Sequence, residues 1–225
     1  MQLLFLKVKS NIQMNFSCLK NVTVILLVFL FAGCQKEMAT LLPLQQETGM
    51  QTSTRQQLKT AVPFTTYTIL AGQQYCEGNN YPPYSTLAMR FTVRFDSSDI
   101  YTNQLASNQY DYNKLYGFSD NNSDHHNFSA RFGWRWCNGA IELSAYTYND
   151  GIRSIKDLGS IDIKKEHLCA ILVSGNHYDF VLDGVTTSVP RTSKTKKGIG
   201  YKLLPYFGGD EVAPHAINIQ IKETK

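Results

Sequence analysis

Apolar and polar residues alternate with a period of two along the chain from residue 63 onward. In residues 89–95, MRFTVRF, one side of the expected strand carries the apolar residues and the other carries Arg90 and Arg94. This alternation is typical of a β-strand with one buried face. No segment of ten or more residues in this part of the chain shows the apolar repeat of a helix. The pattern predicts an all-β domain over residues 63–225.

The clearest predicted hairpin spans residues 127–148. Its centre is Asn138-Gly139, because both central residues of a type I′ turn need a positive φ angle. This register puts on one apolar face the pairs Trp136 with Ile141, Trp134 with Leu143 and Phe132 with Ala145. It puts on the opposite face the pairs Arg135 with Glu142, Arg131 with Tyr146 and Ser129 with Tyr148. The two tryptophans are therefore expected in the core rather than as platforms for a sugar.

A second predicted hairpin turns at Gly175-Asn176. It places on one face the residues Cys169, Ile171, Val173, Tyr178, Phe180 and Leu182. Asp183-Gly184 is expected to turn the chain again, and isoleucines alternate with polar residues in the last strand, residues 217–221. Many strands separated by short turns, in a domain of about 160 residues, indicate two antiparallel sheets packed face to face.

The N-terminal part of the chain has a different pattern. Residues 22–34, VTVILLVFLFAGC, form one apolar run behind Lys20. The run is about half as long as a membrane-spanning helix needs, and it ends in small residues before Cys34. These features predict a signal peptide over residues 1–33. Met14 is a second candidate start, because the segment from Met14 has a compact basic beginning and lacks the apolar patch that precedes it.

The ending LFAGC, residues 30–34, resembles the lipobox of bacterial lipoproteins. In that family the cysteine thiol is acylated and the chain is cut just before it, which implies that Cys34 becomes the lipidated first residue. The next three residues, Gln35-Lys36-Glu37, resemble the signal that sends Bacteroidota-type lipoproteins to the outer face of the outer membrane. The resemblance implies a protein that is lipid-anchored in the outer membrane and faces outward. An ordinary secretory signal cut nearby is the alternative.

Residues 34–62 are rich in Gln, Thr and Met without a sustained period, and they are expected to form a flexible tether. Removing residues 1–33 takes away three lysines and no acidic residue, so the net charge of +4 falls to about +1. The charge therefore gives no argument for a nucleic-acid partner. Three cysteines remain in the domain, Cys76, Cys137 and Cys169. One disulfide can form among them in an exported protein, and the sequence does not choose the pair.

Two parts of the domain resemble known families. Residues 177–185, HYDFVLDGV, are similar to the hairpin of concanavalin A-like and laminin G-like jelly rolls, a fold that polysaccharide lyases share. Residues 129–151 and 200–221 resemble a family of Bacteroidota lipoproteins. These resemblances imply a concanavalin A-like jelly roll. They do not specify the chemistry, because this fold hosts lectins, glycosidases and lyases alike.

Four arginines lie opposite the expected core side of their strands: Arg90, Arg94, Arg131 and Arg135. If both strands belong to one concave sheet, they form a groove of guanidinium groups, which bind carboxylate or sulfate with two hydrogen bonds. Arg135 is expected to pair with Glu142 across the hairpin, whereas Arg131 faces Tyr146 and has no acidic partner. Tyrosine rings can stack on sugars. The candidate ligand-binding residues are Arg131, Tyr146, Tyr148, Arg90 and Arg94.

The loop DNNSDHH, residues 120–126, leads into the first hairpin. The sequence predicts no cofactor, and Asp120 and Asp124 are the candidate ligands if a calcium ion is bound. His126, or its neighbour His125, is a candidate base. The same residue types are common in surface turns that have no function.

The leading hypothesis is a non-catalytic lipoprotein on the cell surface that binds a polysaccharide, acidic if the arginines line the groove. The first alternative is a polysaccharide lyase that acts by β-elimination on a uronate-containing glycan, with His126, Tyr146 and Arg131 in the catalytic roles. The second is a structural or adhesion module without a small ligand. The paired carboxylates of a glycosidase of this fold are missing, as are the motifs of serine hydrolases and of phosphate- and dinucleotide-binding proteins.

Overall fold

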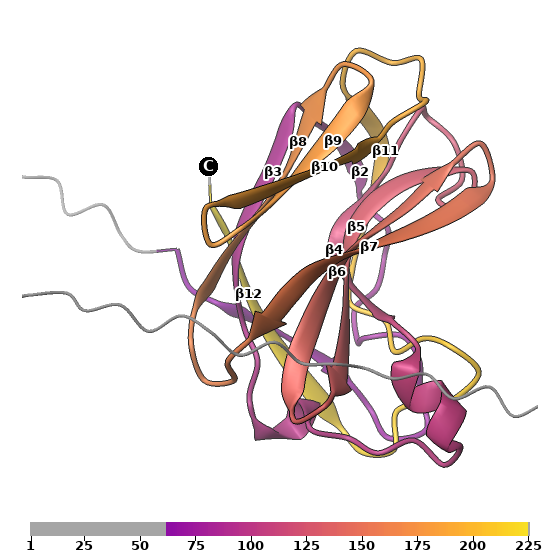
Figure 1. The fold of residues 1–225 in the computed structure, drawn as a ribbon. Coiled ribbons are helices and arrows are strands. Elements are labelled where there is room, and N and C mark those ends of the chain that lie inside the picture. Colours follow the sequence, from indigo (N-terminus) through magenta and orange to yellow (C-terminus); the bar gives the residue numbers. More distant parts are fainter. Residues whose placement is uncertain (1–61, 225) are drawn as a thin grey trace, which may run out of the picture. The chain divides into compact units, whose positions relative to one another are not determined.

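The computed structural model describes residues 62–224 of the chain (Figure 1). The predicted signal peptide, the predicted lipidation site Cys34 and nearly all of the predicted tether lie outside these residues. Within the described part, no helix is long and apolar enough to cross a membrane.

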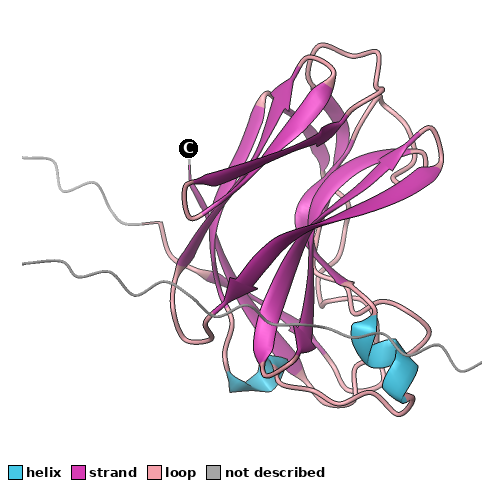
Figure 2. Ribbon diagram, in the orientation of Figure 1, coloured by secondary structure: helices cyan, strands magenta, loops and turns pink. Residues whose placement is uncertain are grey.

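Two six-stranded sheets make up the domain, and every neighbouring pair of strands is antiparallel. The first sheet has the order β1 (Thr65–Ile69), β12 (Ile217–Thr224), β3 (Ala88–Arg94), β8 (His167–Ser174), β9 (His177–Leu182) and β10 (Val185–Pro190). The second has the order β2 (Pro83–Thr86), β11 (Gly198–Leu203), β4 (Asn113–Ser119), β5 (Phe128–Cys137), β6 (Ala140–Asn149) and β7 (Ile152–Ile161). Two short 3-10 helices lie in the loops, η1 (Ser97–Asp99) and η2 (Ala106–Tyr110). Figure 2 shows the two sheets facing each other, so the predicted all-β sandwich is confirmed.

The core lies between the two sheets, where aromatic residues of both meet. Phe132 of β5 packs edge to face against Phe91 of β3 and Phe180 of β9, with ring centroids 5.5 and 5.1 Å apart. All three rings are fully or almost fully buried. Burial of each large side chain stabilises the fold by about 1.5–3 kcal/mol. The inner faces are therefore committed to packing, and polar chemistry is left to the outer faces and the loops.

The first hairpin, β5–β6, has the predicted register. Trp134 pairs with Leu143, Trp136 with Ile141 and Arg131 with Tyr146. The turn residues Asn138 and Gly139 have φ angles of 54° and 79°, as a type I′ turn requires. Trp134 is fully buried and Trp136 is half-buried against the core. The prediction that both tryptophans lie on the core side is confirmed.

The second hairpin, β8–β9, also has its predicted register, with Val173 opposite Tyr178 and Cys169 opposite Leu182. Cys169 is buried in the core, as expected. Cys76 and Cys137 are buried as well, and all three thiols are free. The cysteines of the described residues thus form no disulfide with one another in this structure.

Candidate functional site

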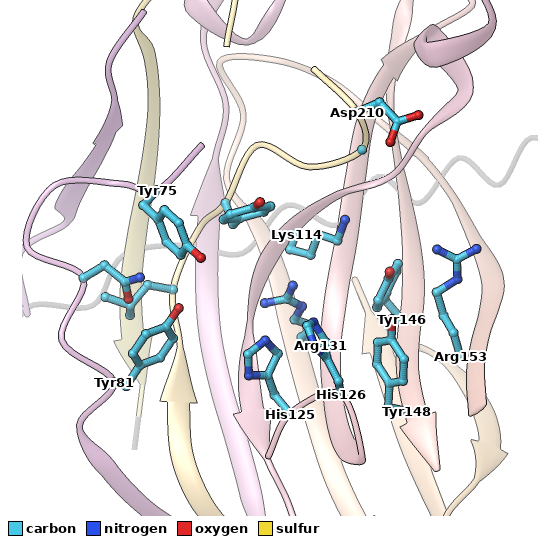
Figure 3. A pocket seen from close by; sticks show the side chains of 14 residues that line it. Tyr75, Tyr81, Lys114, His125, His126, Arg131, Tyr146, Tyr148, Arg153 and Asp210 are labelled. Atoms are coloured by element: carbon cyan, nitrogen blue, oxygen red, sulfur yellow. The ribbon is translucent and has the colours of Figure 1, made fainter. Parts of the chain in front are cut away.

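A hollow of about 380 Å³ lies over the outer face of the second sheet. Strands β4 to β7 form its floor, and loops that precede β2, precede β5 and follow β11 form its walls. Its lining is mainly cationic and aromatic: Tyr75, Asn79, Tyr81, Lys114, His125, His126, Arg131, Tyr146, Tyr148, Arg153, Leu204, Tyr206, Gly209 and Asp210. Figure 3 shows Arg131 near the middle of this hollow, with the other labelled side chains around it.

Arg131 of β5 is a buried cation, with only 8% of its surface exposed. Its guanidinium carbon lies 5.8 Å from the ring centroid of Tyr146, and the guanidinium forms no ion pair or hydrogen bond with the described residues. Burial lowers the pKa of Arg131 to about 10, so the group stays charged at neutral pH. The neighbouring strand makes room for it at Gly117, where an added Cβ would lie 2.2 Å from the Cβ of Arg131.

Lys114 of β4 is a second cation without an acidic partner in the described residues. Its amine lies 5.2 Å from the ring centroid of Tyr146 and 5.7 Å from that of Tyr206. Burial and the charges of Arg131 and Arg153 lower the pKa of Lys114 to about 8. Gly208 lets the following loop close over the amine, because an added Cβ there would lie 2.3 Å from it.

Arg153 of β7 is exposed at the edge of the hollow. A hydrogen bond with the Tyr146 side chain raises its pKa, so it too is charged. The acids that offset these three cations are few: Asp111 acts on Lys114 and Arg153, and Asp210 stands at the rim. The hollow therefore has an excess of positive charge, which favours an anionic ligand.

His125 and His126 close one end of the hollow. The His125 imidazole Nδ1 lies 2.8 Å from the hydroxyl of Tyr201, and the ring stacks on Tyr81 with centroids 6.3 Å apart. Burial, followed by the charge of Arg131, lowers the pKa of His125 to about 4. The imidazole is therefore neutral at pH 7, and its Nδ1 forms a hydrogen bond with the Tyr201 hydroxyl. His126 is exposed and packs against Tyr148, with ring centroids 5.4 Å apart.

The structure brings together four of the residues singled out from the sequence: Arg131, Tyr146, Tyr148 and His126. It separates them from two others. Arg90 and Arg94 lie on β3, which belongs to the first sheet, so the hypothesis that they share a groove with Arg131 is wrong. Face alternation within a strand is local, whereas membership of a sheet depends on pairing with distant strands.

The guanidinium groups of Arg94 and Arg135 both have partners within the protein, so neither needs a ligand. Arg94 donates to the side-chain oxygen of Gln220 at 2.8 Å and lies over the ring of Phe64. Arg135 forms the predicted ion pair with Glu142, at 2.6 Å between Nη2 and Oε2. The expectation that Arg135 has an acidic partner and Arg131 has none is confirmed.

Asp120 is not available as a calcium ligand, so that hypothesis is wrong for this residue. Its carboxylate is fully buried, pairs with Arg191 at 2.8 Å and accepts a hydrogen bond from the Tyr178 hydroxyl at 2.6 Å. Burial raises the pKa of Asp120, but these hydrogen bonds outweigh burial and leave its pKa lowered. Asp124 is exposed and accepts from the backbone NH of His126. Among residues 62–224, no group of three or more His, Cys, Asp or Glu side chains could hold a metal ion.

Sequence reasoning missed Lys114, Tyr81 and Arg153. A β-bulge between Lys114 and Gly117 shifts the register of β4 against β5, so strict alternation cannot assign the face of Lys114. Tyr81 lies in a loop, where no periodicity applies. Arg153 pairs with Tyr148 across the β6–β7 hairpin. Its place could have been found, because Asp-Gly at residues 150–151 is a hairpin signal as clear as Asn-Gly.

Comparisons with known proteins show no family for this chain. No protein-family model matches the chain, and no curated protein matches its sequence. The alginate lyase vAL-1 from Chlorella virus is 10% identical, with 71% of this chain and 82% of that chain covered and a TM-score of 0.44. A glycoside hydrolase family 16 endo-glucanase from Bacteroides ovatus is also 10% identical, with 72% and 81% covered and a TM-score of 0.44.

The carbohydrate binding module CBM66 from Bacillus subtilis is 11% identical, with 72% of this chain and 97% of that chain covered and a TM-score of 0.36. These similarities are too low to assign a superfamily. The domain is an all-β sandwich of two six-stranded antiparallel sheets. The function has to be argued from the side chains of the hollow.

Proposed function

We propose that the outer face of the second sheet binds an acidic polysaccharide. The observation that supports this most is Arg131, a buried cation with no carboxylate partner in the described residues. Taking a guanidinium out of water costs free energy, and proteins usually recover part of it through an ion pair. A carboxylate or sulfate group of a ligand would supply the missing partner with two parallel hydrogen bonds.

The aromatic lining of the hollow favours a sugar as the bearer of that anion. Tyr146 and Tyr148 stand side by side on β6, with ring centroids 6.0 Å apart. Tyr81 and Tyr206 also line the hollow. A pyranose ring packs its C–H face on such rings, while tyrosine hydroxyls bond to its hydroxyl groups. The side-chain oxygen of Asn79 is buried and has no hydrogen-bond partner in the part of the chain that the structure describes, so it offers a further acceptor.

Three cations within one hollow favour a ligand with more than one negative charge. The charges of Arg131 and Arg153 both lower the pKa of Lys114, which means that the three repel one another in the free protein. A carboxylate placed among them would remove this repulsion. A uronate polymer or a sulfated polysaccharide brings one anionic group for every one or two sugar rings and fits this requirement.

Calorimetry on the domain, residues 63–225, tests the ligand class. The probes are a uronate oligosaccharide, a sulfated oligosaccharide and a neutral glucan oligosaccharide of equal length. We expect one of the two anionic probes to bind at least tenfold more tightly than the neutral probe in about 50 mM salt, and to weaken as salt is added. Equal affinities for all three probes, or no binding by any of them, would remove this function and leave an adhesion module.

Lyase activity is the second candidate, and Lys114 is the observation that favours it. An amine with a pKa of about 8 stands beside a buried arginine and has no acidic partner in residues 62–224. In a β-elimination, Arg131 would neutralise the uronate carboxylate and neutral Lys114 would take the proton from the adjacent ring carbon. The released electron pair forms the C=C bond, the C4–O bond breaks, and the leaving oxygen takes a proton from a tyrosine hydroxyl of the hollow.

Absorbance of the unsaturated uronate product separates the two candidates. A binding protein leaves the absorbance of an oligouronate solution unchanged over hours, whereas a lyase raises it. A rise that Lys114→Met abolishes, while affinity for the oligouronate is kept within about tenfold, would establish the lyase. Constant absorbance with measurable binding would establish the binding protein.

We further propose that the domain is held at the outer face of the outer membrane through a lipid on Cys34. This part of the proposal is supported by the sequence of residues 22–37 alone. Mass spectrometry of the full-length protein and its Cys34→Ser variant tests it. The expected result is an acyl mass and detergent partition that the variant loses, and a wild type that lacks the acyl mass would contradict it.

A further inference from the structure

The loop that joins β10 to β11 presents three lysines. Residues 191–197 read RTSKTKK, and Lys194, Lys196 and Lys197 are all exposed. None of the three forms an ion pair with an acid of the described residues. Exposed lysines are usually solvated and uninformative. These three lysines differ from ordinary exposed lysines in two ways: their loop has a fixed backbone conformation, and it lies next to the hollow.

Arg191 fixes the conformation of this loop from within. Its side chain is buried, pairs with Asp120 and also donates to the carbonyl oxygens of Thr195 at 2.7 Å and Lys197 at 3.1 Å. The loop is therefore wrapped around one guanidinium group. Its lysines are held on a fixed backbone, so less conformational entropy is lost when a ligand binds them than on a disordered segment.

The loop lies directly beyond one end of the hollow. The backbone NH of Lys194 donates to Asn121 Oδ1 at 2.9 Å, and Asn121 belongs to the loop that carries His125 and His126. On the other side, the backbone NH of Thr192 donates to Asn149 Oδ1 at 3.0 Å. Asn149 follows Tyr148, the last aromatic residue of the hollow on β6. The β10–β11 loop and the β6–β7 hairpin lie at the same end of the domain in Figure 1.

We propose that residues 191–197 form a second binding region for the same polyanionic chain. The ligand then runs from Arg131 across the His126–Tyr148 pair and reaches the lysines. This inference rests on the proposed function and adds that the ligand is a long internal stretch of an acidic polysaccharide rather than a chain end or a short oligosaccharide. Lysines would contact it through charge attraction and counterion release, without fixing which sugar is bound.

Binding as a function of ligand length tests the inference. The variant Lys194→Gln/Lys196→Gln/Lys197→Gln is compared with the wild type on the anionic trisaccharide and dodecasaccharide of the class that binds. The control variant Arg90→Gln/Lys164→Gln/Lys165→Gln removes the same charge from exposed positions elsewhere. We expect roughly tenfold weaker binding of the dodecasaccharide by the lysine variant, a smaller salt dependence, and unchanged binding of the trisaccharide. The control variant should lose less than about twofold.

The outcomes separate this inference from the proposed function. Tight dodecasaccharide binding by the lysine variant, or equal losses for both ligand lengths, would overturn the second region while leaving the hollow as a site. A wild type that binds neither ligand would overturn both. Binding of the wild type and the lysine variant to vesicles that contain anionic lipid is measured in parallel. If the lysine variant loses vesicle binding but binds the dodecasaccharide as tightly as the wild type, the lysines serve a membrane surface and the inference is overturned.

Discussion

Two buried arginines show how differently one residue type can serve this domain. Arg191 is 4% exposed, and Arg131 is 8% exposed. Arg191 pairs with Asp120 and donates to several oxygens of its own loop, so its charge is fully compensated. Arg131 lies between tyrosine rings and two other cations and has no acceptor among the described residues. The first arginine holds the fold together, and we propose that the second serves a ligand.

The comparison teaches that the partner of a buried charge matters more than the burial. A buried ion pair recovers part of its desolvation cost, and removing one partner destabilises the fold by about 3–5 kcal/mol. An unpaired buried cation keeps the full cost of desolvation unless a ligand supplies the anion. Arg94 and Arg135 resemble Arg191 rather than Arg131, because the guanidinium of each has a hydrogen-bond acceptor on a neighbouring strand.

The largest expected effect is on the paired arginine. Arg191→Leu should lower the free energy of unfolding by about 3–5 kcal/mol, because it leaves the Asp120 carboxylate buried without its cation. Urea unfolding followed by tryptophan fluorescence measures this loss. The double variant Asp120→Asn/Arg191→Leu should recover part of the stability. A single variant as stable as the wild type would mean that the two arginines do not differ as described.

The stability of the domain at acid pH should also depend on the ion pair between Asp120 and Arg191. Hydrogen bonds from Arg191 and Tyr178 leave the pKa of Asp120 below its usual value. A depressed pKa in the folded state adds stability above the unfolded pKa, and this stability is lost as the pH falls through the folded pKa. We therefore expect the wild type to lose stability below about pH 4. The double variant should lose less over the same range, and equal acid sensitivity would contradict the assignment.

The next effect concerns Lys114, whose pKa of about 8 depends on its cationic neighbours. A bound carboxylate raises the pKa of Lys114, so the complex takes up a proton and affinity falls as the pH rises above 8. The fall is at most about tenfold per pH unit for one proton. Calorimetry between pH 7 and 9.5 should show this fall for the wild type and a flat profile for Lys114→Met. A flat wild-type profile would show that the ligand does not approach Lys114.

The smallest expected change in stability concerns Asp99, a buried acid without a cationic partner in the described residues. It can be compared with the two buried arginines. Asp99 is fully buried, one of its oxygens has no hydrogen-bond partner among the described residues, and burial raises its pKa to about 8. Unlike an arginine, it can lose its charge by taking a proton. A raised folded pKa means that stability falls as the pH rises from about 4 to 8, because only the unfolded chain releases the proton there. Asp99→Asn should therefore be more stable at pH 8 by about 1 kcal/mol in urea unfolding, and lower stability would contradict this account.

The sequence was enough to predict what local rules determine. The registers of both hairpins follow from two-residue turns and from alternation, and the face of Arg131 and Tyr146 follows from the register. The absence of an acid opposite Arg131 was visible in the same way. These features need no knowledge of the remaining strands.

What the sequence did not predict depends on contacts between distant residues. The pairing of Asp120 with Arg191 joins positions 71 residues apart, so an apparent calcium ligand became part of a buried ion pair. The exclusion of Arg90 and Arg94 from the hollow depends on the pairing of β3 with β12 and β8. The side chain of Lys114 reaches the hollow through a bulge that alternation does not reveal.

The central claim is that Arg131 serves a ligand and not the fold, and one variant tests it most directly. On the same preparations of wild type, Arg131→Gln and the exposed control Arg90→Gln, both the free energy of unfolding and the affinity for the acidic oligosaccharide are measured. We expect Arg131→Gln to keep or gain stability within about 1 kcal/mol and to bind roughly 10- to 150-fold more weakly, the range of a charge-assisted hydrogen bond. A loss of several kcal/mol of stability with unchanged affinity would contradict the claim.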